Sequence, residues 1–471
     1  MSSSAAPPPS NKRHSIARRN AARRGTFASR FTELMPNFLE AKSQKPASTS
    51  DGRAKPPMDR RADQTKNRAP APSSTSRHAL DWFVFFLADV QTGFGAFVSV
   101  YLTAQKWTQT DIGLVLTIGG IVGLLGQIPG GALVDAARSE RWVAALAVIV
   151  VGASAFALAV SPIFLIVLLS RILQAAASCV LGPAIAAISL GLVGRKAIGH
   201  RLGRNASFAS VGSGLAALGM GACGYYVSDR AAFFVAAAMA APALLALAFI
   251  RNEEVDATRA HGGIPTPDQK TAIRGLLGLL RNRSLLIFGG CIVLFQLANA
   301  AMLPLAASMM TLRSNKFATI LVATSIVAPQ IIVAALSPWV GRKAQLWGRR
   351  PLLVLCFAAL AVRGALFSLV IDPYMLMAVQ LLDGVSGAAL GVLVPLTVAD
   401  VSRNTGHFNL AQGAVGCAVG VGASISTTLV GYVSDRFDSA TAFLMMTGVA
   451  VAGLAAVWLA MPETRPSDDE D

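Results

Sequence analysis

Charged residues are scarce in this sequence. Only 14% of its 471 residues are Asp, Glu, Lys or Arg, and 54% are hydrophobic, whereas about 25% charged residues is usual in soluble domains. This composition excludes an ordinary water-soluble protein, because so few polar side chains cannot cover its surface. It favours a chain whose solvent is the lipid bilayer.

Cysteine is also rare, and its placement excludes two kinds of site. The five cysteines lie inside apolar runs at wide, irregular spacing, with no Cys-x-x-Cys pair and no neighbouring histidine pair. A zinc site needs such closely spaced ligands, and a disulfide framework is typical of short secreted chains. We therefore expect reduced, buried thiols and no metal. The cysteines are Cys179, Cys223, Cys291, Cys356 and Cys417.

Sequence motifs of the common enzyme classes are missing as well. The chain has no phosphate-binding Gly-x-x-x-x-Gly-Lys loop, no His-Glu-x-x-His and no Gly-x-Ser-x-Gly, and its five histidines are scattered. We expect neither enzyme activity nor a cofactor. A primary pump is disfavoured too, so any active process would draw on an ion gradient or on the solute's own gradient.

The charge that is present is concentrated near the start of the chain. Residues 1–79 hold 16 Lys or Arg and 5 Asp or Glu, which supplies +11 of the net +16. They are rich in Ser, Ala, Pro and Arg, so we expect a disordered basic cytoplasmic tail with no nucleic-acid partner. It is either a translated extension or an over-extended gene start, with the initiator at Met35 or Met58.

Twelve apolar segments follow, each near the roughly 20 residues that cross a hydrocarbon core. They form two sets of six, in 80–250 and 284–461, with a polar cytoplasmic linker at 251–283 and an acidic tail at 462–471. The predicted loops on the side of the termini carry 17 Lys or Arg and the opposite loops carry 5. The positive-inside rule therefore places both termini in the cytoplasm, most simply of a bacterial inner membrane. The predicted spans are 80–104, 110–136, 142–160, 163–193, 206–228, 231–250, 284–311, 317–340, 351–371, 374–399, 410–434 and 438–461.

An internal repeat relates the two sets. Tyr-Val-Ser-Asp-Arg occurs at 226–230 and again at 432–436, and a Gly-rich charged turn at 130–142 has a second copy at 341–351. Because each set has an even number of spans, the repeat is parallel, with the halves related by an axis along the membrane normal.

These features resemble the major facilitator superfamily of secondary transporters, over nearly all of residues 80–465. The family's turn between its second and third helices reads Gly-x-Leu-x-Asp-x-x-Gly-Arg-[Lys/Arg], which Gly131, Leu133 and Asp135 match, while Glu140 stands where a base is usual. The resemblance implies an all-α membrane protein with twelve transmembrane helices in two six-helix halves. It also implies transport by alternating access.

Other motifs agree with the resemblance in part. The second copy of the turn keeps its glycines and bases, but Gln345 replaces the acid. The glycines of the fifth span lack the proline of the family's antiporter motif. Three further matches are Gly341, Gly348, Arg349 and Arg350 in the second turn, Arg171, Gln174 and Ala175 for Arg-x-x-Gln-Gly in the fourth span, and Pro462-Glu463-Thr464 after the last span.

The resemblance gives the two turns a role in gating. Asp135 can meet Arg138 or Arg141, and the family pattern implies that it also faces the amino-terminal end of the eleventh helix, whose dipole favours an anion. The alternative is an orientation signal in which the two arginines anchor the loop in the cytoplasm. With Gln345 in place of the acid, we expect a weaker, hydrogen-bonded contact in the second half. The gating candidates are Gly131, Asp135, Arg138, Arg141, Gln345, Arg349 and Arg350.

Four ionisable residues lie inside the predicted spans, where a charge is costly and marks a candidate functional site. At about 1.5 Å per residue, Asp89 and Arg171 reach similar mid-membrane depths, so we predict a pair, either in the transport path or as a static contact. Arg363 and Asp383 also match in depth and are predicted to form a structural ion pair. Asp89 is the candidate proton-binding carboxylate. The pathway candidates are Asp89, Gln91, Arg171, Gln174, Asn299 and Asp383.

Together the residues predict a monomeric secondary transporter for a small organic solute. Proton-coupled export is favoured because Asp89 supplies a carboxylate and no sodium-site pattern is evident. Proton-coupled uptake is the alternative within transport. A carrier-like receptor or scaffold is the alternative from a different class.

Overall fold

The computed structural model describes residues 72–92, 94, 96–262, 278, 281–313, 318–403 and 405–465, and every regular element in these ranges is helical. The predicted tail lies outside them up to residue 71. The first helix, α3 (Ser74–Thr92), begins six residues before the predicted start. Ser73 caps it, its hydroxyl accepting a hydrogen bond from the backbone N–H of Ser76 at 3.1 Å, a polar signal that a search for apolar runs misses.

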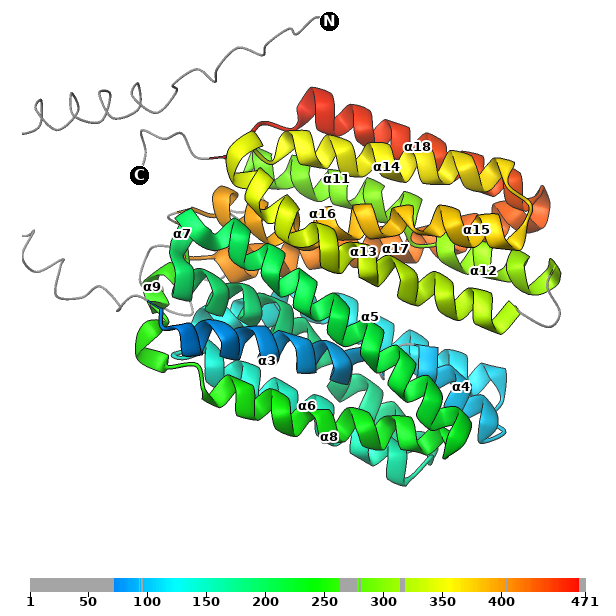
Figure 1. Ribbon diagram of the computed structural model, residues 1–471, viewed down its shortest axis with the longest axis horizontal. Coiled ribbons are helices and arrows are strands. Elements are labelled where there is room, and N and C mark those ends of the chain that lie inside the picture. The colour runs from blue at the N-terminus through cyan, green and yellow to red at the C-terminus, as the bar shows by residue number, and fades with distance from the viewer. Residues whose placement is uncertain are drawn as a thin grey trace, which may run out of the picture. The chain divides into compact units, whose positions relative to one another are not determined.

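The first six predicted spans form helices α3 to α8, blue to green in Figure 1. The first span is broken, with α4 continuing it after α3. The predicted loop at 194–205 is wrong, because residues 195–205 are helical. The fourth and fifth spans, which share the label α7, are two helices that meet in a turn at Gly194, where φ is 67° and ψ is 177°. A glycine adopts this angle without strain. The helices are α4 (Ala96–Ala104), α5 (Gln109–Ala136), α6 (Glu140–Val160), α7 (Phe164–Tyr226) and α8 (Asp229–Ala248).

The last six predicted spans form helices α11 to α18, and two of these spans are broken too. The seventh is interrupted at 300–301 and the tenth at Leu381. Between the two sets lie the short helices η2 (Asn252–Glu254) and α9 (Ala257–Ala260). The second set comprises α11 (Arg283–Asn299), α12 (Met302–Arg313), α13 (Ala318–Trp347), α14 (Arg350–Leu369), α15 (Pro373–Gln380), α16 (Leu382–Val401), α17 (Phe408–Arg436) and α18 (Ser439–Ala460).

Ten helical stretches in the described ranges are long and apolar enough to cross a membrane. The difference from twelve predicted spans has two causes. One stretch, Phe164–Gly224, holds the fourth and fifth spans together, and the broken first span is not among the ten. All twelve predicted spans therefore correspond to helical segments.

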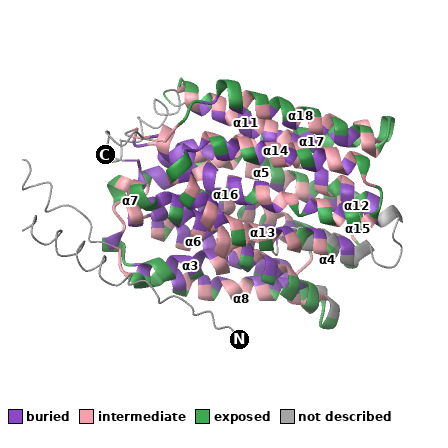
Figure 2. Cartoon of the chain, turned by 45° about the horizontal axis from the view of Figure 1, so that its top comes forward, coloured by how far each residue is buried: buried purple, intermediate pink, exposed green. Residues whose placement is uncertain are grey.

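Each set of six packs around its own hydrophobic core. One cluster of buried residues comes from α3 to α9 alone. The other comes almost entirely from α11 to α18, joined by four residues of α7. In Figure 2, purple for buried residues is frequent on the inner helices, whereas the outer helix α18 carries much of the green for exposed residues. Two separate cores make each half a body that can move as a unit.

Candidate functional site

The two halves meet mainly through two pairs of helices, α5 with α17 and α7 with α13, and glycine brings the backbones together in both. A Cβ atom on Gly131 would lie 2.1 Å from the carbonyl oxygen of Asn409, and one on Gly341 would lie 2.2 Å from that of Gly199. Gly341 follows Gly131 by 210 residues, and Asn409 follows Gly199 by 210. The repeat therefore places the same close contact on both sides of the interface.

Asp135 lies next to the first of these contacts and caps the amino-terminal end of α17. It is 6% exposed, and its carboxylate accepts three hydrogen bonds: from the backbone N–H of Asn409 at 3.2 Å, the side-chain amide of Asn409 at 2.8 Å and the backbone N–H of Leu410 at 2.8 Å. Free N–H groups and the helix dipole favour an anion there. The structure thus brings Asp135 to the eleventh predicted span.

The expected meeting of Asp135 with the arginines of its own turn does not occur. Arg141 donates to the backbone carbonyl of Ala248 at 3.4 Å, and neither Arg141 nor the exposed Arg138 forms an ion pair with a described residue. The amides of α17 already occupy the carboxylate. The contact from this turn to the other half consists of hydrogen bonds to a helix terminus.

The second turn has no hydrogen bonds equivalent to those of Asp135 within the described residues. The side-chain nitrogen of Gln345 is buried and has no hydrogen-bond partner within the described residues, so the expected hydrogen-bonded contact is not formed. Gly199, the counterpart of Asn409, has no side chain to bond. A Cβ on Gly199 would lie 2.7 Å from that nitrogen, so the amide of Gln345 fills the space instead.

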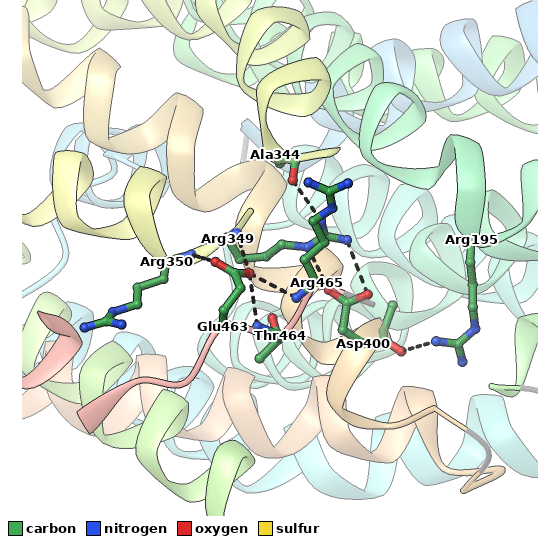
Figure 3. A network of polar contacts seen from close by, with 9 residues as sticks. Arg195, Ala344, Arg349, Arg350, Asp400, Glu463, Thr464 and Arg465 are labelled. Atoms are coloured by element: carbon green, nitrogen blue, oxygen red, sulfur yellow. Dashed lines mark hydrogen bonds and ion pairs between the residues drawn. The ribbon is translucent and has the colours of Figure 1, made fainter. Parts of the chain in front are cut away.

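Arg349 and Arg350 hold elements of the second half together (Figure 3). Arg349 is 2% exposed, and its Nε lies 2.8 Å from Asp400 Oδ2 at the end of α16. Glu463 accepts hydrogen bonds from the backbone N–H groups of Arg349 at 2.8 Å and Arg350 at 3.1 Å, which caps α14. Gly348, with φ of 93°, admits this carboxylate, because a Cβ there would lie 2.3 Å from it.

We predict that Glu463→Ala lowers the thermal stability of the protein. Two N–H groups at the start of α14 would lose their acceptor, which costs about 1 kcal/mol for a helix cap. The measurement is the unfolding temperature of the protein in detergent. Glu253→Ala, at an exposed position in η2, is the control and should leave it unchanged. Equal unfolding temperatures for the two variants would show that the cap contributes nothing.

Asp89 and Arg171 do not form the predicted pair. Arg171 instead donates to the backbone carbonyl of Phe94 at 3.0 Å and to the side chain of Gln174 at 2.9 Å. The break between α3 and α4 leaves carbonyl groups without helical partners, and the guanidinium satisfies one of them. One carboxylate oxygen of Asp89 is buried without a hydrogen-bond partner in the described part of the chain. Gln91 adjoins the break through its own carbonyl, which accepts from Phe94 N–H at 3.1 Å.

Arg363 and Asp383 do lie together, and Asn299 joins them. Arg363 is 1% exposed; it forms an ion pair with Asp383 and a hydrogen bond to the side-chain oxygen of Asn299. Gln380 also donates to Asp383 at 3.3 Å. Asn299 ends α11, and Asp383 follows the break in the tenth span. This cluster therefore ties α14 to two interrupted helices.

The described part of the linker docks at the Asp135 end of the bundle. Glu254 accepts hydrogen bonds from the N–H and hydroxyl of Ser73, both at 2.9 Å. Burial alone would raise the pKa of Glu254, but hydrogen bonds from Ser73 and Ser76 outweigh it and hold the pKa below its usual value. His261 lies 3.5 Å from Glu140. The unusual acid of the first turn thus faces the linker.

A cavity of about 360 Å³ lies between the halves. Its lining comes from α3, α5, α7, α16 and α17 and is largely aliphatic. Its polar side chains are Gln127, Asn205 and Gln412, and none of the lining residues in the described ranges is charged. None of the predicted pathway residues reaches this cavity.

In the α5–α17 pair, close contact between the halves lies at the Asp135 end. A Cβ on Gly413 would lie 2.2 Å from the carbonyl oxygen of Gln127 in α5. Gly431 lies on the same face of α17, because 18 residues make five turns, yet a Cβ there would meet nothing within 4 Å. Gly113, 18 residues from Gly131 on α5, is equally open. The helices therefore pack at the Asp135 end and separate toward the far end.

Comparison with known proteins explains this two-half architecture. The model of the Major Facilitator Superfamily matches residues 82–328 and 290–471. The chain belongs to this superfamily. Two proteins from different strains of Mycobacterium tuberculosis, each called an uncharacterized MFS-type transporter, are 39% identical to it over 399 residues, covering 83% of this chain and 94% of each relative.

Solved structures of major facilitator proteins share the fold. The human organic anion transporter TETRAN superposes with a TM-score of 0.66 at 16% identity, covering 82% of this chain and 100% of that one. The nucleoside transporter NupG gives 0.58 at 16% identity, covering 81% and 99%. As a major facilitator protein, the chain is a multi-pass membrane carrier of small molecules and not an enzyme.

Two polar clusters of this major facilitator protein were missed by the sequence analysis. Asp81, 1% exposed, pairs with Arg201 at 2.7 Å and Arg204 at 2.6 Å. Arg195 donates across the interface to the backbone carbonyl of Ala399 at 2.7 Å (Figure 3). The three arginines were counted as loop charges, and Asp81 lies at the start of the first predicted span. The 210-residue offset is the signal that could have marked their helices as an interface.

Proposed function

We propose that this carrier moves a small organic solute by alternating access, with residues 80–250 and 284–461 acting as two rocking bodies. The observation that supports this most strongly is the Asp135 cap on α17, a contact that joins the halves at the end where α5 and α17 pack. Breaking it, together with the glycine contacts, would open the cavity to that end. The proposed gating residues are those of the two turns, with Asp135 central and Gln345 the weaker partner.

The Asp135 end is proposed to face the cytoplasm. The unequal distribution of Lys and Arg between the loops supports this orientation, with both termini inside and the inner membrane as location. On this assignment the structure corresponds to an outward-open state. The structural role of the Arg363 and Asp383 pair would be to keep the broken helices of the second half in register.

Proton coupling through Asp89 is the proposed energy source, and export the proposed direction. A buried carboxylate oxygen without a hydrogen-bond partner supports this, because no Lys or Arg in the described part of the chain forms an ion pair that would hold the group in its ionised form. Gln91, Arg171, Gln174, Asn299 and Asp383 remain candidate pathway residues, although Arg171 and Asn299 are engaged in local contacts.

We expect Asp89→Asn to remove the dependence of transport on a pH gradient. The amide cannot take up a proton, so flux through the variant should be the same with and without the gradient. The measurement is flux of size-matched neutral, anionic and cationic organic solutes in proteoliposomes. Asp372→Asn, at an exposed helix cap, is the control and should keep the dependence.

The same assay separates the alternatives. If the solute moves in the direction opposite to the flow of protons, the carrier is an exchanger and exports its solute. If the solute moves in the same direction as the protons, the carrier takes up its solute by symport. Wild-type flux that ignores the gradient would overturn proton coupling. No flux of any solute in the panel would favour the receptor or scaffold.

A further inference from the structure

We propose that the cavity between the halves binds uncharged, mainly aliphatic solutes that carry a hydrogen-bonding group such as an amide, a hydroxyl or a carbonyl. Gln127 and Gln412 would bond that group, one from each half. This inference rests on the proposed transport function and specifies its substrate class.

The lining of the cavity excludes charged solutes. Apart from three amide side chains, the residues around it are Gly, Ala, Val, Leu, Ile and Pro. Among the described lining residues there is no acid to pair with an organic cation, no base to pair with an anion, and no aromatic ring to stack on a planar group. An ion that left water for this cavity would lose its hydration without gaining a partner.

The basic residue that donates to the cavity lining is already neutralised. Arg201 donates to Asp81 at 2.7 Å and to the side-chain oxygen of Asn205 at 2.8 Å. The amide nitrogen of Asn205 in turn donates to Ser189 at 2.8 Å. Asn205 therefore uses both ends of its amide within its own half and presents neither to a solute.

The other two amides have capacity left. The side-chain amides of Gln127 and Gln412 form no hydrogen bond with any residue in the described ranges. Gln127 reaches from α5 to α17, since a Cβ on Gly416 would lie 2.3 Å from its side-chain oxygen. Gln412 lies one helical turn from that glycine. A polar group in an apolar cavity requires a partner, and a solute with a donor and an acceptor supplies one to each amide.

The size of the cavity bounds the solute. A volume of about 360 Å³ is near the lower end of the roughly 300–1,000 Å³ usual for ligand pockets. Because the two amides belong to different halves, a solute that bonds both would link them. Separation of α5 from α17 would break that link, so binding and the rocking motion would be coupled.

Three eight-carbon probes that differ only in the head group test the substrate class: octanamide, octanoate and octylamine. The full-length protein in lipid nanodiscs is heated with each probe at equal concentration and neutral pH. Octanamide is expected to raise the unfolding temperature by about 2 °C, because a ligand that binds only the folded state stabilises it. Octanoate and octylamine should not, although their alkyl chains are the same.

Variants of Gln412 identify the site. Gln412→Leu keeps the volume without hydrogen bonds and should abolish the octanamide shift, whereas Gln105→Leu, in the far-end loop between α4 and α5, should keep it. Gln412→Glu adds an acid and should transfer the response from octanamide to octylamine. Equal responses to all three probes, no response to octanamide, or an unchanged shift in Gln412→Leu would each overturn the proposal.

The flux and binding results together distinguish a failure of the proposed substrate class from a failure of the proposed transport function. Flux of a charged solute in proteoliposomes without octanamide binding would leave transport standing and remove the substrate class. Octanamide binding that depends on Gln412, without flux of any solute, would leave the site standing and remove transport.

Discussion

Gly131→Ala is expected to lower transport on the order of 100-fold, because overpacking at a contact costs about 1–3 kcal/mol or more. The added Cβ would lie 2.1 Å from the carbonyl oxygen of Asn409. Backbone atoms on both sides of this contact belong to packed helices and cannot move aside without separating the halves. The variant should therefore fail to close at the Asp135 end. The measurement is initial flux in proteoliposomes, normalised to the amount of inserted protein.

Gly120→Ala is the matched control. It lies on the same helix, 11 residues from Gly131 and nearly on the same face, but its Cβ would meet nothing within 4 Å. Flux through this variant should stay within about twofold of wild type. Similar losses in both variants would mean that helix α5 tolerates no substitution of glycine, and the contact with Asn409 would lose its special role.

Asp135→Asn is expected to reduce transport by about tenfold or more while leaving the amount of protein in the membrane near normal. The amide removes the negative charge from the end of α17 and replaces one acceptor oxygen with a donor. Charge-assisted hydrogen bonds contribute roughly 1.5–3 kcal/mol, and each 1.4 kcal/mol is tenfold in a conformational equilibrium. Flux together with quantitative immunoblotting of membranes measures both quantities.

The control for this change is Asp372→Asn, which also converts a carboxylate at a helix amino terminus to an amide. Asp372 caps α15 within its own half, so its substitution should leave transport unchanged. Normal flux in Asp135→Asn at normal expression would defeat the gating role and favour the simpler role of an orientation signal.

Apolar length and charge distribution were enough to predict the helices, because a membrane leaves few alternatives to apolar helices. Boundaries failed where polar side chains are satisfied inside the protein. Arg195, Arg201 and Arg204 were placed in a loop, but hydrogen bonds and ion pairs hold them on a helix. The turn at Gly194 depends on one backbone angle, which hydropathy does not encode.

The sequence predicted the contact of Asp135 with the start of a helix. It did not predict that Arg171 would bond to the break between α3 and α4. Asp135 reaches α17 because the family pattern fixes both ends of the contact. Equal estimated depth in the membrane correctly predicted the pair of Arg363 and Asp383. The same argument was wrong for Asp89 and Arg171. The difference is the break after α3, whose free carbonyl at Phe94 takes the guanidinium. Helix breaks of this kind are not marked by hydropathy or depth alone.

The central claim is that the two ends of the carrier open in alternation, and spin-label distances test it most directly. One label pair spans the halves at the Asp135 end, at Trp142 and Leu346, and the other at the far end, at Val227 and Phe437, all exposed. The five free cysteines are first replaced by alanine. Pulsed dipolar spectroscopy then compares the wild-type sequence at position 135 with Asp135→Asn. We predict that the variant lengthens the distance at the Asp135 end and shortens it at the far end. An unchanged far-end distance, or a lengthening at both ends, would contradict alternating access.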